Sequence, residues 1–151
     1  MQAFIKYPND IIINNKKIAG VLVEIISVLE KKYAISGIGL NINNEFFKDY
    51  LLDAISMYQI SHKKFNKLEL FKSVISNIKE IMSIYSKKQY MIKNLYIEFL
   101  FGYKNFIPCL YKKEKIHVKI VSITNQGLLT LLIKDFGFKT VNALDVKFLL
   151  S

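Results

Sequence analysis

The stretch that most constrains the fold is the apolar run from Lys16 to Val28, which follows the asparagine pair Asn14-Asn15. Asparagine tolerates a positive φ, so this pair favours a two-residue hairpin loop between a short strand at residues 11–13 and the run. Because the run is apolar almost without interruption, it is typical of a central strand covered on both faces. Glu24 interrupts it, and we expect this carboxylate at a solvent-exposed face or in a site.

A break in a strand precedes this hairpin. Residues 3–6 have the pattern of a short strand, and Pro8 removes a ladder donor while forcing Tyr7 to extended backbone. The pair Asn9-Asp10 then has turn chemistry. Lys6 therefore lies at the break, where the pattern taken alone is that of a plain turn with a surface lysine.

The next strand is expected over residues 33–43, and it carries two interior glycines. By the period of two, Gly37 and Gly39 lie on one face, and Asn41 continues it. A glycine inside a strand gives up side-chain packing, so its presence needs a reason. One reason is a ligand that lies flat on the backbone; the other is a bulge or tight packing under a helix. Gly20, in the preceding strand, likewise permits close approach of a backbone or a ligand.

Beyond residue 43 the apolar period becomes helical. We expect a first helix from near Glu45 to about residue 54, capped by the asparagine before it. A second, amphipathic helix is expected over residues 71–85, preceded by a capping-box variant of Asn66 with Glu69. A third helix is expected over about residues 89–101, ending at the glycine that follows.

The last third has short apolar segments separated by glycine and asparagine turns, which is typical of a small β-barrel. Strands are expected near residues 106–108, 115–123, 128–134, 138–143 and 145–149. The sequence therefore predicts an α/β (α+β) fold in two parts. A mixed sheet with packed helices covers residues 1–102, and a small barrel covers residues 103–151.

The charge of the chain is strongly basic. Its 151 residues carry a net charge of +10, and every basic residue is lysine. Such a chain could bind nucleic acid or an acidic protein surface. We favour a plainer interpretation, because lysine, isoleucine, asparagine, tyrosine and phenylalanine are abundant together, as in proteins from AT-rich genomes. Arginine would also be expected wherever phosphate is bound bidentately.

Several classes of site and location are disfavoured. No apolar run reaches the roughly 18 residues that a membrane span needs, and residues 1–6 lack the pattern of a signal peptide. Cys109 is the single cysteine, which excludes an intrachain disulfide and fits a reducing cytoplasm. His62 and His117 have no partner at metal-ligand spacing, so we expect no protein metal centre.

Three motifs, taken in order, resemble the biotin protein ligases. They are Lys6-Tyr7-Pro8-Asn9-Asp10, Ala19-Gly20-Val21-Leu22-Val23-Glu24 and Gly37-Ile38-Gly39-Leu40-Asn41-Ile42-Asn43. In that family they read Lys-Trp-Pro-Asn-Asp, Ala-Gly-Ile-Leu-hydrophobic-Glu and Gly-x-Gly-x-Asn-x-Asn. Each motif alone is a weak signal, and the three in one order are a specific one. Residues 117–129 are similar, more loosely, to the SH3-like C-terminal domain of these ligases.

The resemblance implies an ATP-dependent, carbon–nitrogen bond-forming ligase of the cytoplasm. Such an enzyme activates biotin to biotinyl-5′-AMP and transfers the biotinyl group to a lysine of a biotin carrier protein, such as that of acetyl-CoA carboxylase. ATP, biotin and Mg²⁺ are the ligands implied.

The resemblance also implies roles for individual residues. Lys6 matches the catalytic lysine, whose compact ammonium meets the biotin carboxylate and the α-phosphate. Gly37 and Gly39 match glycines that border biotin, and Asn41 matches an asparagine near the adenylate phosphates and Mg²⁺. Further binding positions are matched by Asn9, Asp10 and Gly20.

Two departures from the family pattern qualify this expectation. Tyr7 replaces the tryptophan of the first motif, which keeps a large amphipathic ring. The family's earlier half, with its Gly-Arg-Gly-Arg loop over the adenylate, has no counterpart, and the chain contains no arginine. We therefore expect a ligase fragment, one half of a split ligase that meets a separately encoded N-terminal half, or a degraded copy. The alternative functions are a non-catalytic remnant or partner subunit and, from charge alone, a basic nucleic-acid-binding module.

Overall fold

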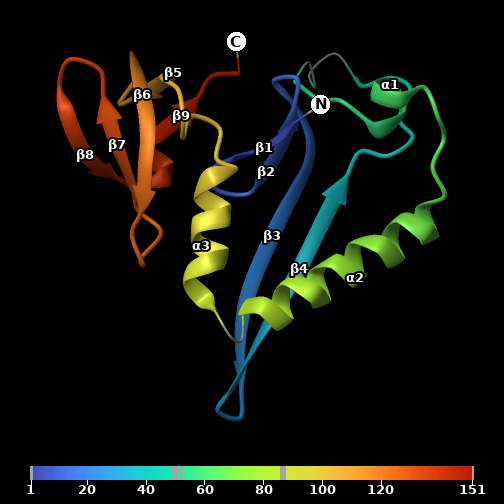
Figure 1. Cartoon of the computed structure of the whole chain (residues 1–151). Coiled ribbons are helices and arrows are strands. Elements are labelled where there is room, and N and C mark those ends of the chain that lie inside the picture. Colours follow the sequence, from blue (N-terminus) through green and yellow to red (C-terminus); the bar gives the residue numbers. More distant parts are fainter. Residues whose placement is uncertain (1, 49–50, 52, 86–87, 151) are drawn as a thin grey trace. The chain divides into compact units, whose positions relative to one another are not determined.

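The computed structural model describes residues 2–48, 51, 53–85 and 88–150 (Figure 1). The chain divides into two compact units, and each is described by itself. The first unit comprises Met1–Ala3 with Asn9–Phe65, and the second comprises Phe4–Pro8 with Asn66–Ser151. The compact units thus divide after residue 65, and the expected domains 1–102 and 103–151 stay a prediction.

The first sheet contains the hairpins that the sequence predicts. Its strands are β1 (Ala3–Lys6), β2 (Asp10–Ile13), β3 (Lys16–Val28) and β4 (Lys31–Leu40), in the order β1-β2-β3-β4. The hairpin asparagines have φ of 51° and 56°, so the expected loop and the bounds of β3 are confirmed. The second hairpin turns at Leu29-Glu30, with φ of 46° and 64°, and β4 covers Lys31–Leu40 where the sequence predicts a strand over residues 33–43.

The far part of β3 and β4 forms a two-stranded ribbon, drawn as the long blue and cyan hairpin of Figure 1. Strand β2 pairs with β3 only as far as Gly20, so residues 22–36 form what we call the free ribbon. The expected covering of β3 on both faces is not observed there. Eight large apolar side chains of the free ribbon are at least 41% exposed: Leu22, Val23, Ile25, Ile26, Val28, Leu29, Tyr33 and Ile35.

The helix expected from Glu45 is wrong over residues 45–48, and residues 49, 50 and 52 lie outside the described part. Tertiary partners take the carbonyls that a helix would need. The Ser56 hydroxyl donates to the Asn44 carbonyl, 2.6 Å away, and the side-chain amide of Gln59 donates to the Glu45 carbonyl, 3.0 Å away. The first helix is instead α1 (Met57–Ser61), which begins with a capping box of Ser56 and Gln59.

The second unit begins with two helices, α2 (Lys67–Tyr85) and α3 (Gln89–Glu98). The Asn66 side chain accepts hydrogen bonds from the amides of Leu68 and Glu69, at 2.9 and 3.3 Å, which confirms its role as a cap. No helix in the described part of the chain combines the length and apolarity required to cross a membrane.

The second sheet has five antiparallel strands. They are β5 (Ile107–Tyr111), β6 (Glu114–Ile123), β7 (Leu129–Ile133), β8 (Gly137–Val141) and β9 (Val146–Phe148), with a short 3₁₀ turn at Ala143–Asp145. The order is β8-β7-β6-β5-β9, and no pairing of β8 with β9 is described. The expected strands are therefore present with small shifts in their ends, and the closure into an SH3-like barrel is not confirmed.

The core of the second unit lies on this sheet. Its fully buried members include Cys109, Val118, Ile120, Leu129 and Leu131. Leu100, at the end of the segment that follows α3, completes it, and Ile5 of β1 packs against it. Gly102 makes the tight turn into this core with φ of +90°.

Replacement of Gly102 by alanine tests this turn. A Cβ would lie 2.5 Å from Cδ1 of Ile107 at a backbone conformation that alanine disfavours, so we expect a loss of about 2–4 kcal/mol. Gly137→Ala is the matched control, because its φ is +87° but no atom lies within 4 Å of the added Cβ. That variant should lose only ~1–2 kcal/mol in urea unfolding. Equal losses for the two variants would contradict the steric argument.

Candidate functional site

Lys6 lies at the end of β1, in a segment that the second unit holds on both sides. The amide of Ile5 donates to the carbonyl of Phe99, and the amide of Phe101 donates to the carbonyl of Ile5, each at 2.8 Å. Lys6 itself is half-buried, and its ammonium forms no ion pair or hydrogen bond with a residue in the described part of the chain. The backbone that carries this lysine is therefore fixed by hydrogen bonds of its neighbour Ile5.

Two tyrosines fix the turn that follows Lys6. The Tyr7 hydroxyl donates to the carbonyl of Gly127, in the turn between β6 and β7. The Tyr96 hydroxyl, on α3, donates to the carbonyl of Pro8 at 2.6 Å. Burial raises the pKa of both hydroxyls, to about 12 for Tyr96, so both remain protonated donors at neutral pH. Sequence reasoning gave no role to Tyr96, which is distant in sequence from the motif it supports.

Asp10 and Gly20 are brought together in the first unit. They are opposite each other across β2 and β3, and the Asp10 carboxylate pairs with the Lys17 ammonium at 2.6 Å. A Cβ on Gly20 would lie 3.3 Å from the carboxylate and from the end of the lysine side chain. Gly20 therefore leaves room for this ion pair. Asn9 completes the group, since its side-chain amide donates to the carbonyl of Val21 at 2.8 Å.

Gly37 and Gly39 form an open stretch of backbone on β4. The pairing with β3 runs unshifted through both residues, with Gly39 opposite Gly20, so neither glycine marks a bulge. A Cβ on Gly37 would meet no atom within 4 Å, and one on Gly39 would meet only the Gly20 carbonyl at 3.9 Å. The regular pairing excludes a bulge as the reason for these glycines. The backbone here is open, as the explanation by a bound ligand requires.

Asn41 lies at the end of this open stretch. Its side-chain nitrogen donates to the carbonyls of Ile55 and Lys17, at 3.2 and 3.4 Å, and its own carbonyl accepts from Met57. These bonds fix the direction of the side chain. Because the nitrogen is engaged, the amide oxygen is the atom suited to a cation, and Mg²⁺ prefers oxygen ligands.

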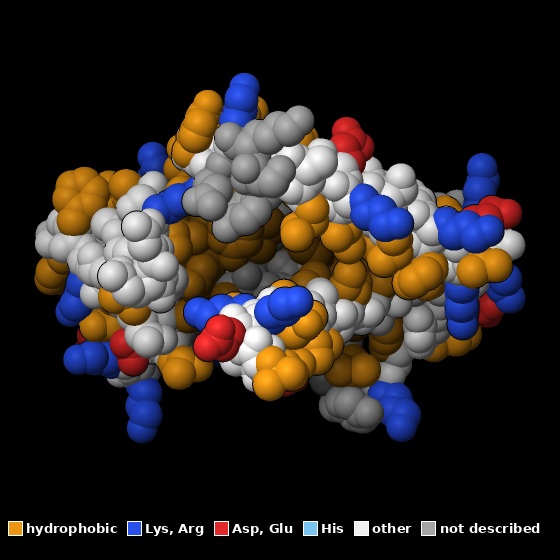
Figure 2. Space-filling model, turned by 90° about the horizontal axis from the view of Figure 1, so that it is seen from below, with side chains coloured by type: hydrophobic (Ala, Val, Ile, Leu, Met, Phe, Trp, Pro, Cys, Tyr) orange, Lys and Arg blue, Asp and Glu red, His pale blue; other side chains and the backbone are white. Residues whose placement is uncertain are grey.

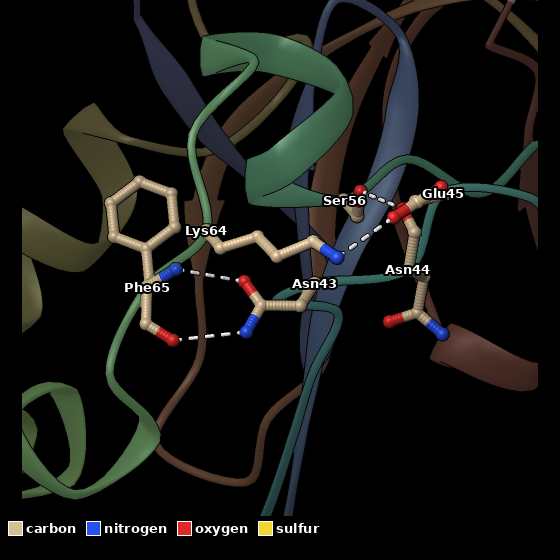
Figure 3. A network of polar contacts seen from close by, with 6 residues as sticks. All are labelled: Asn43, Asn44, Glu45, Ser56, Lys64 and Phe65. Carbon is tan, nitrogen blue, oxygen red and sulfur yellow. Dashed lines mark hydrogen bonds and ion pairs between the residues drawn. The ribbon is translucent and has the colours of Figure 1, made fainter.

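A polar network closes the segment beyond Asn41, and Figure 3 shows it from close by. The Asn43 side chain makes two bonds of 2.9 Å to the backbone of Phe65, one as donor and one as acceptor. Lys64 pairs with Glu45 at 3.1 Å, and buried Ser56 holds the carbonyl of Asn44. The second asparagine of the third motif is therefore structural. The pattern Ser-x-x-Gln at residues 56–59 signals this network, and sequence reasoning missed it.

The second unit also has a hollow in its surface. A hollow of about 490 Å³ in the second unit is lined by Tyr103, Lys104, Lys119 and Phe138 among others, and none of the residues expected at the site lines it. The described residues include no cluster of three acidic, histidine or cysteine side chains that could hold a metal ion. Figure 2 shows lysine side chains over one face of the molecule, with hydrophobic side chains exposed between them.

The expected site residues thus fall in both units. Lys6 belongs to the second unit, and Asn9, Asp10, Gly20, Gly37, Gly39 and Asn41 belong to the first. Comparison with known proteins supports this reading of the motifs. The model of the biotin/lipoate A/B protein ligase family matches residues 1–43, which hold all seven residues. The chain is similar to the biotin protein ligases.

The relatives and solved structures cover more than the motifs. The bifunctional ligase/repressor BirA of Bacillus spizizenii is 28% identical over 97% of this chain. Apo biotin protein ligase from Aquifex aeolicus matches 98% of the chain with a TM-score of 0.73 and 26% identity. The same ligase in complex with biotin and ATP gives a TM-score of 0.74 with 25% identity. The chain spans 46% of the length of BirA and 65% and 62% of the two Aquifex chains.

A pH titration tests the tyrosine that supports the Lys6 turn. Burial raises the pKa of Tyr96 from 10.0 to about 12, with a smaller contribution from the charge of Tyr7. The stability due to Tyr96 is therefore complete below about pH 10 and is lost as the pH rises through about 12. We expect the unfolding free energy of the wild type to fall more steeply over this window than that of Tyr96→Phe.

The matched control is Tyr90→Phe on the same helix, because Tyr90 is 64% exposed. Its pH profile should follow that of the wild type. At pH 7, loss of the hydrogen bond to Pro8 should cost the Tyr96→Phe variant ~0.5–1.5 kcal/mol in urea unfolding. Parallel pH profiles for wild type and Tyr96→Phe would show that this hydroxyl is not buried as described.

Proposed function

We propose that this chain carries part of the active site of a biotin–protein ligase of the cytoplasm. The reaction has two steps. A carboxylate oxygen of biotin attacks the α-phosphorus of ATP and pyrophosphate leaves; then the amine of a carrier lysine attacks the acyl carbon and AMP leaves. The observation that supports this proposal best is the open backbone of Gly37 and Gly39, which ends at the fixed side chain of Asn41.

In this proposal the two glycines form the floor of the biotin site. A flat ring system can approach a strand closely only where no Cβ intervenes, and β4 supplies such a stretch in regular pairing. The Gly20–Gly39 pair extends the floor onto β3. Asp10 and Lys17 present an ion pair beside it, so a ligand meets a polar boundary there.

Lys6 is the proposed catalytic residue. During the first step, negative charge grows on the oxygens of the α-phosphate, and a positioned ammonium stabilises that charge more in the transition state than in the ground state. The bonds on both sides of Lys6 provide the positioning. The residues fit Mg²⁺ only as an ion that ATP brings, because Mg²⁺ keeps several waters and shares substrate phosphates. The oxygen of Asn41 is the proposed protein ligand, and the ion would neutralise phosphate charge.

The alternative is a catalytically incomplete remnant or a partner subunit of a split ligase. The chain spans 46% of the length of BirA. Activity is therefore proposed for this chain together with the ligase segment that precedes the Lys6 motif in the family. The proposed protein substrate is the biotin carrier domain of acetyl-CoA carboxylase.

Substitution of Lys6 tests the catalytic proposal in the chain supplemented with that segment. Lys6→Ala should keep the fold, because Lys6 is only half-buried and unpaired among the described residues. It should lower biotinyl-adenylate formation by roughly 10²–10³-fold, measured as ATP–pyrophosphate exchange. Transfer from preformed biotinyl-adenylate should suffer less. Lys6→Arg should not restore the rate, because its planar fork places the charge differently.

Lys134→Ala is the control for this measurement, since Lys134 is an exposed lysine of the same unit. Its exchange rate should equal that of the wild type. A normal rate of adenylate formation in Lys6→Ala would refute the catalytic role, and the remnant interpretation would then stand.

Substitution of Gly37 tests the biotin floor. No atom lies within 4 Å of the added Cβ in Gly37→Ala, and alanine loses less backbone entropy on folding than glycine. We therefore expect unchanged or slightly higher stability, with biotin binding weakened at least about tenfold by calorimetry. Ser36→Ala, on the other face of the same strand, should bind normally. Normal binding by Gly37→Ala would exclude a ligand lying on this backbone.

A further inference from the structure

The base of the hollow in the second unit is built by side chains from three neighbouring strands. Lys119 of β6 is opposite Leu132 of β7, and Leu132 is opposite Phe138 of β8. Residues directly opposite in an antiparallel pair share a face, so these three side chains form a row across the sheet. The buried core residues Val118 and Leu131 alternate with them along β6 and β7. The row therefore lies on the face of the sheet that is turned away from the core.

The wall of the hollow is fixed to this base. Tyr103 and Lys104 form it, from the segment that follows α3. The carbonyl of Gly102, one residue earlier, accepts a hydrogen bond of 2.8 Å from the amide of Ile120, which also lines the hollow. Wall and base therefore belong to one unit and are joined through the backbone. The volume of about 490 Å³ is within the range of roughly 300–1,000 Å³ for small-molecule sites, which are largely pre-formed.

The lining combines apolar surface with two unpaired positive charges. Neither the Lys104 nor the Lys119 ammonium forms an ion pair or hydrogen bond with another residue in the part of the chain that the structure describes. None of the described residues that line the hollow is acidic. Lys119 is half-buried, so its charge lies near apolar side chains without the partner that would offset its lost hydration. The apolar part of the lining is supplied by Ile120, Val121, Leu132 and Phe138.

We propose that this hollow binds a small organic carboxylate whose body is an apolar ring. The carboxylate would pair with the two ammoniums, since lysine meets an anion as a compact point charge. Arginine, which would suit the bidentate binding of a phosphate, is absent from the lining. The ring would lie against Phe138, which is 72% exposed, because aromatic rings pack in offset or edge-to-face contacts.

This site is separate from the proposed biotin site. None of the seven residues expected there lines the hollow, and all residues that line it belong to the second unit. The inference therefore does not depend on the proposed ligase activity.

The test titrates the chain with three probes that separate charge from apolar surface. Naphthoate carries both, naphthamide has the same ring without the charge, and acetate has the carboxylate without the ring. Calorimetry measures affinity, and methyl chemical shifts of Ile120, Val121 and Leu132 report the location. We expect one naphthoate per chain, with a dissociation constant on the order of 1 mM or below. The other two probes should each bind at least about fivefold more weakly, because each lacks one of the two contacts.

Two substitutions locate the site. Lys119→Met removes the charge and keeps the length of the side chain, and Phe138→Ala removes the ring. Each should raise the dissociation constant of naphthoate at least about threefold. The matched controls are Lys115→Met, an exposed lysine on the same face of β6, and Phe136→Ala, which is 84% exposed; neither residue lines the hollow. Both controls should bind within about twofold of wild type, and all four variants should melt as the wild type does.

The proposal is overturned by any of the following results. Naphthamide that binds as tightly as naphthoate would show that the lysines take no part. Binding that neither Lys119→Met nor Phe138→Ala weakens would place the ligand elsewhere, and no binding by the wild type up to roughly 10 mM would exclude the site. A dimer of the chain that Phe138→Ala dissociates and naphthoate leaves intact would assign this face to a second copy.

Discussion

The backbone ladder between β3 and β4 is the interaction on which the rest of the first unit depends. It runs without a shift from Ala19–Leu40 to Val28–Lys31 and sets Gly20 opposite Gly39. Because register decides which side chains share a face, one slip would turn the glycine floor away from its present face. Asn41 leaves the ladder at its end and ties it to the segment before α1. The ladder thus joins a structural role and the proposed binding role in one strand pair.

The strand that carries Lys6 depends on a different set of contacts. Ile5 is bonded to the segment after α3, Tyr7 to the turn at Gly127, and Pro8 to Tyr96. The first motif is therefore split: Lys6 is supported by the second unit, and Asn9 and Asp10 by the first. In the proposed mechanism, these hydrogen bonds link the second unit's sheet to the position of Lys6.

The free ribbon leaves apolar surface of the first unit exposed. The same apolar run that makes β3 recognisable leaves large side chains in solvent along residues 22–36. Exposure of that extent costs free energy in water, at roughly 25 cal/mol for each Å² of apolar surface.

The sequence by itself determined much of the local structure and indicated the resemblance to the biotin protein ligases. The paired asparagines specified the first hairpin because they accept positive φ, and the period of two placed Gly37 and Gly39 on one face. It could not determine that Glu45 would fail to begin a helix, because distant residues, Ser56 and Gln59, take the carbonyls there. Nor could it show that Tyr96 supports the turn after Lys6, or that the far part of β3 is exposed. Those outcomes depend on contacts between segments far apart in the chain, which local propensity and spacing do not encode and only the tertiary structure decides.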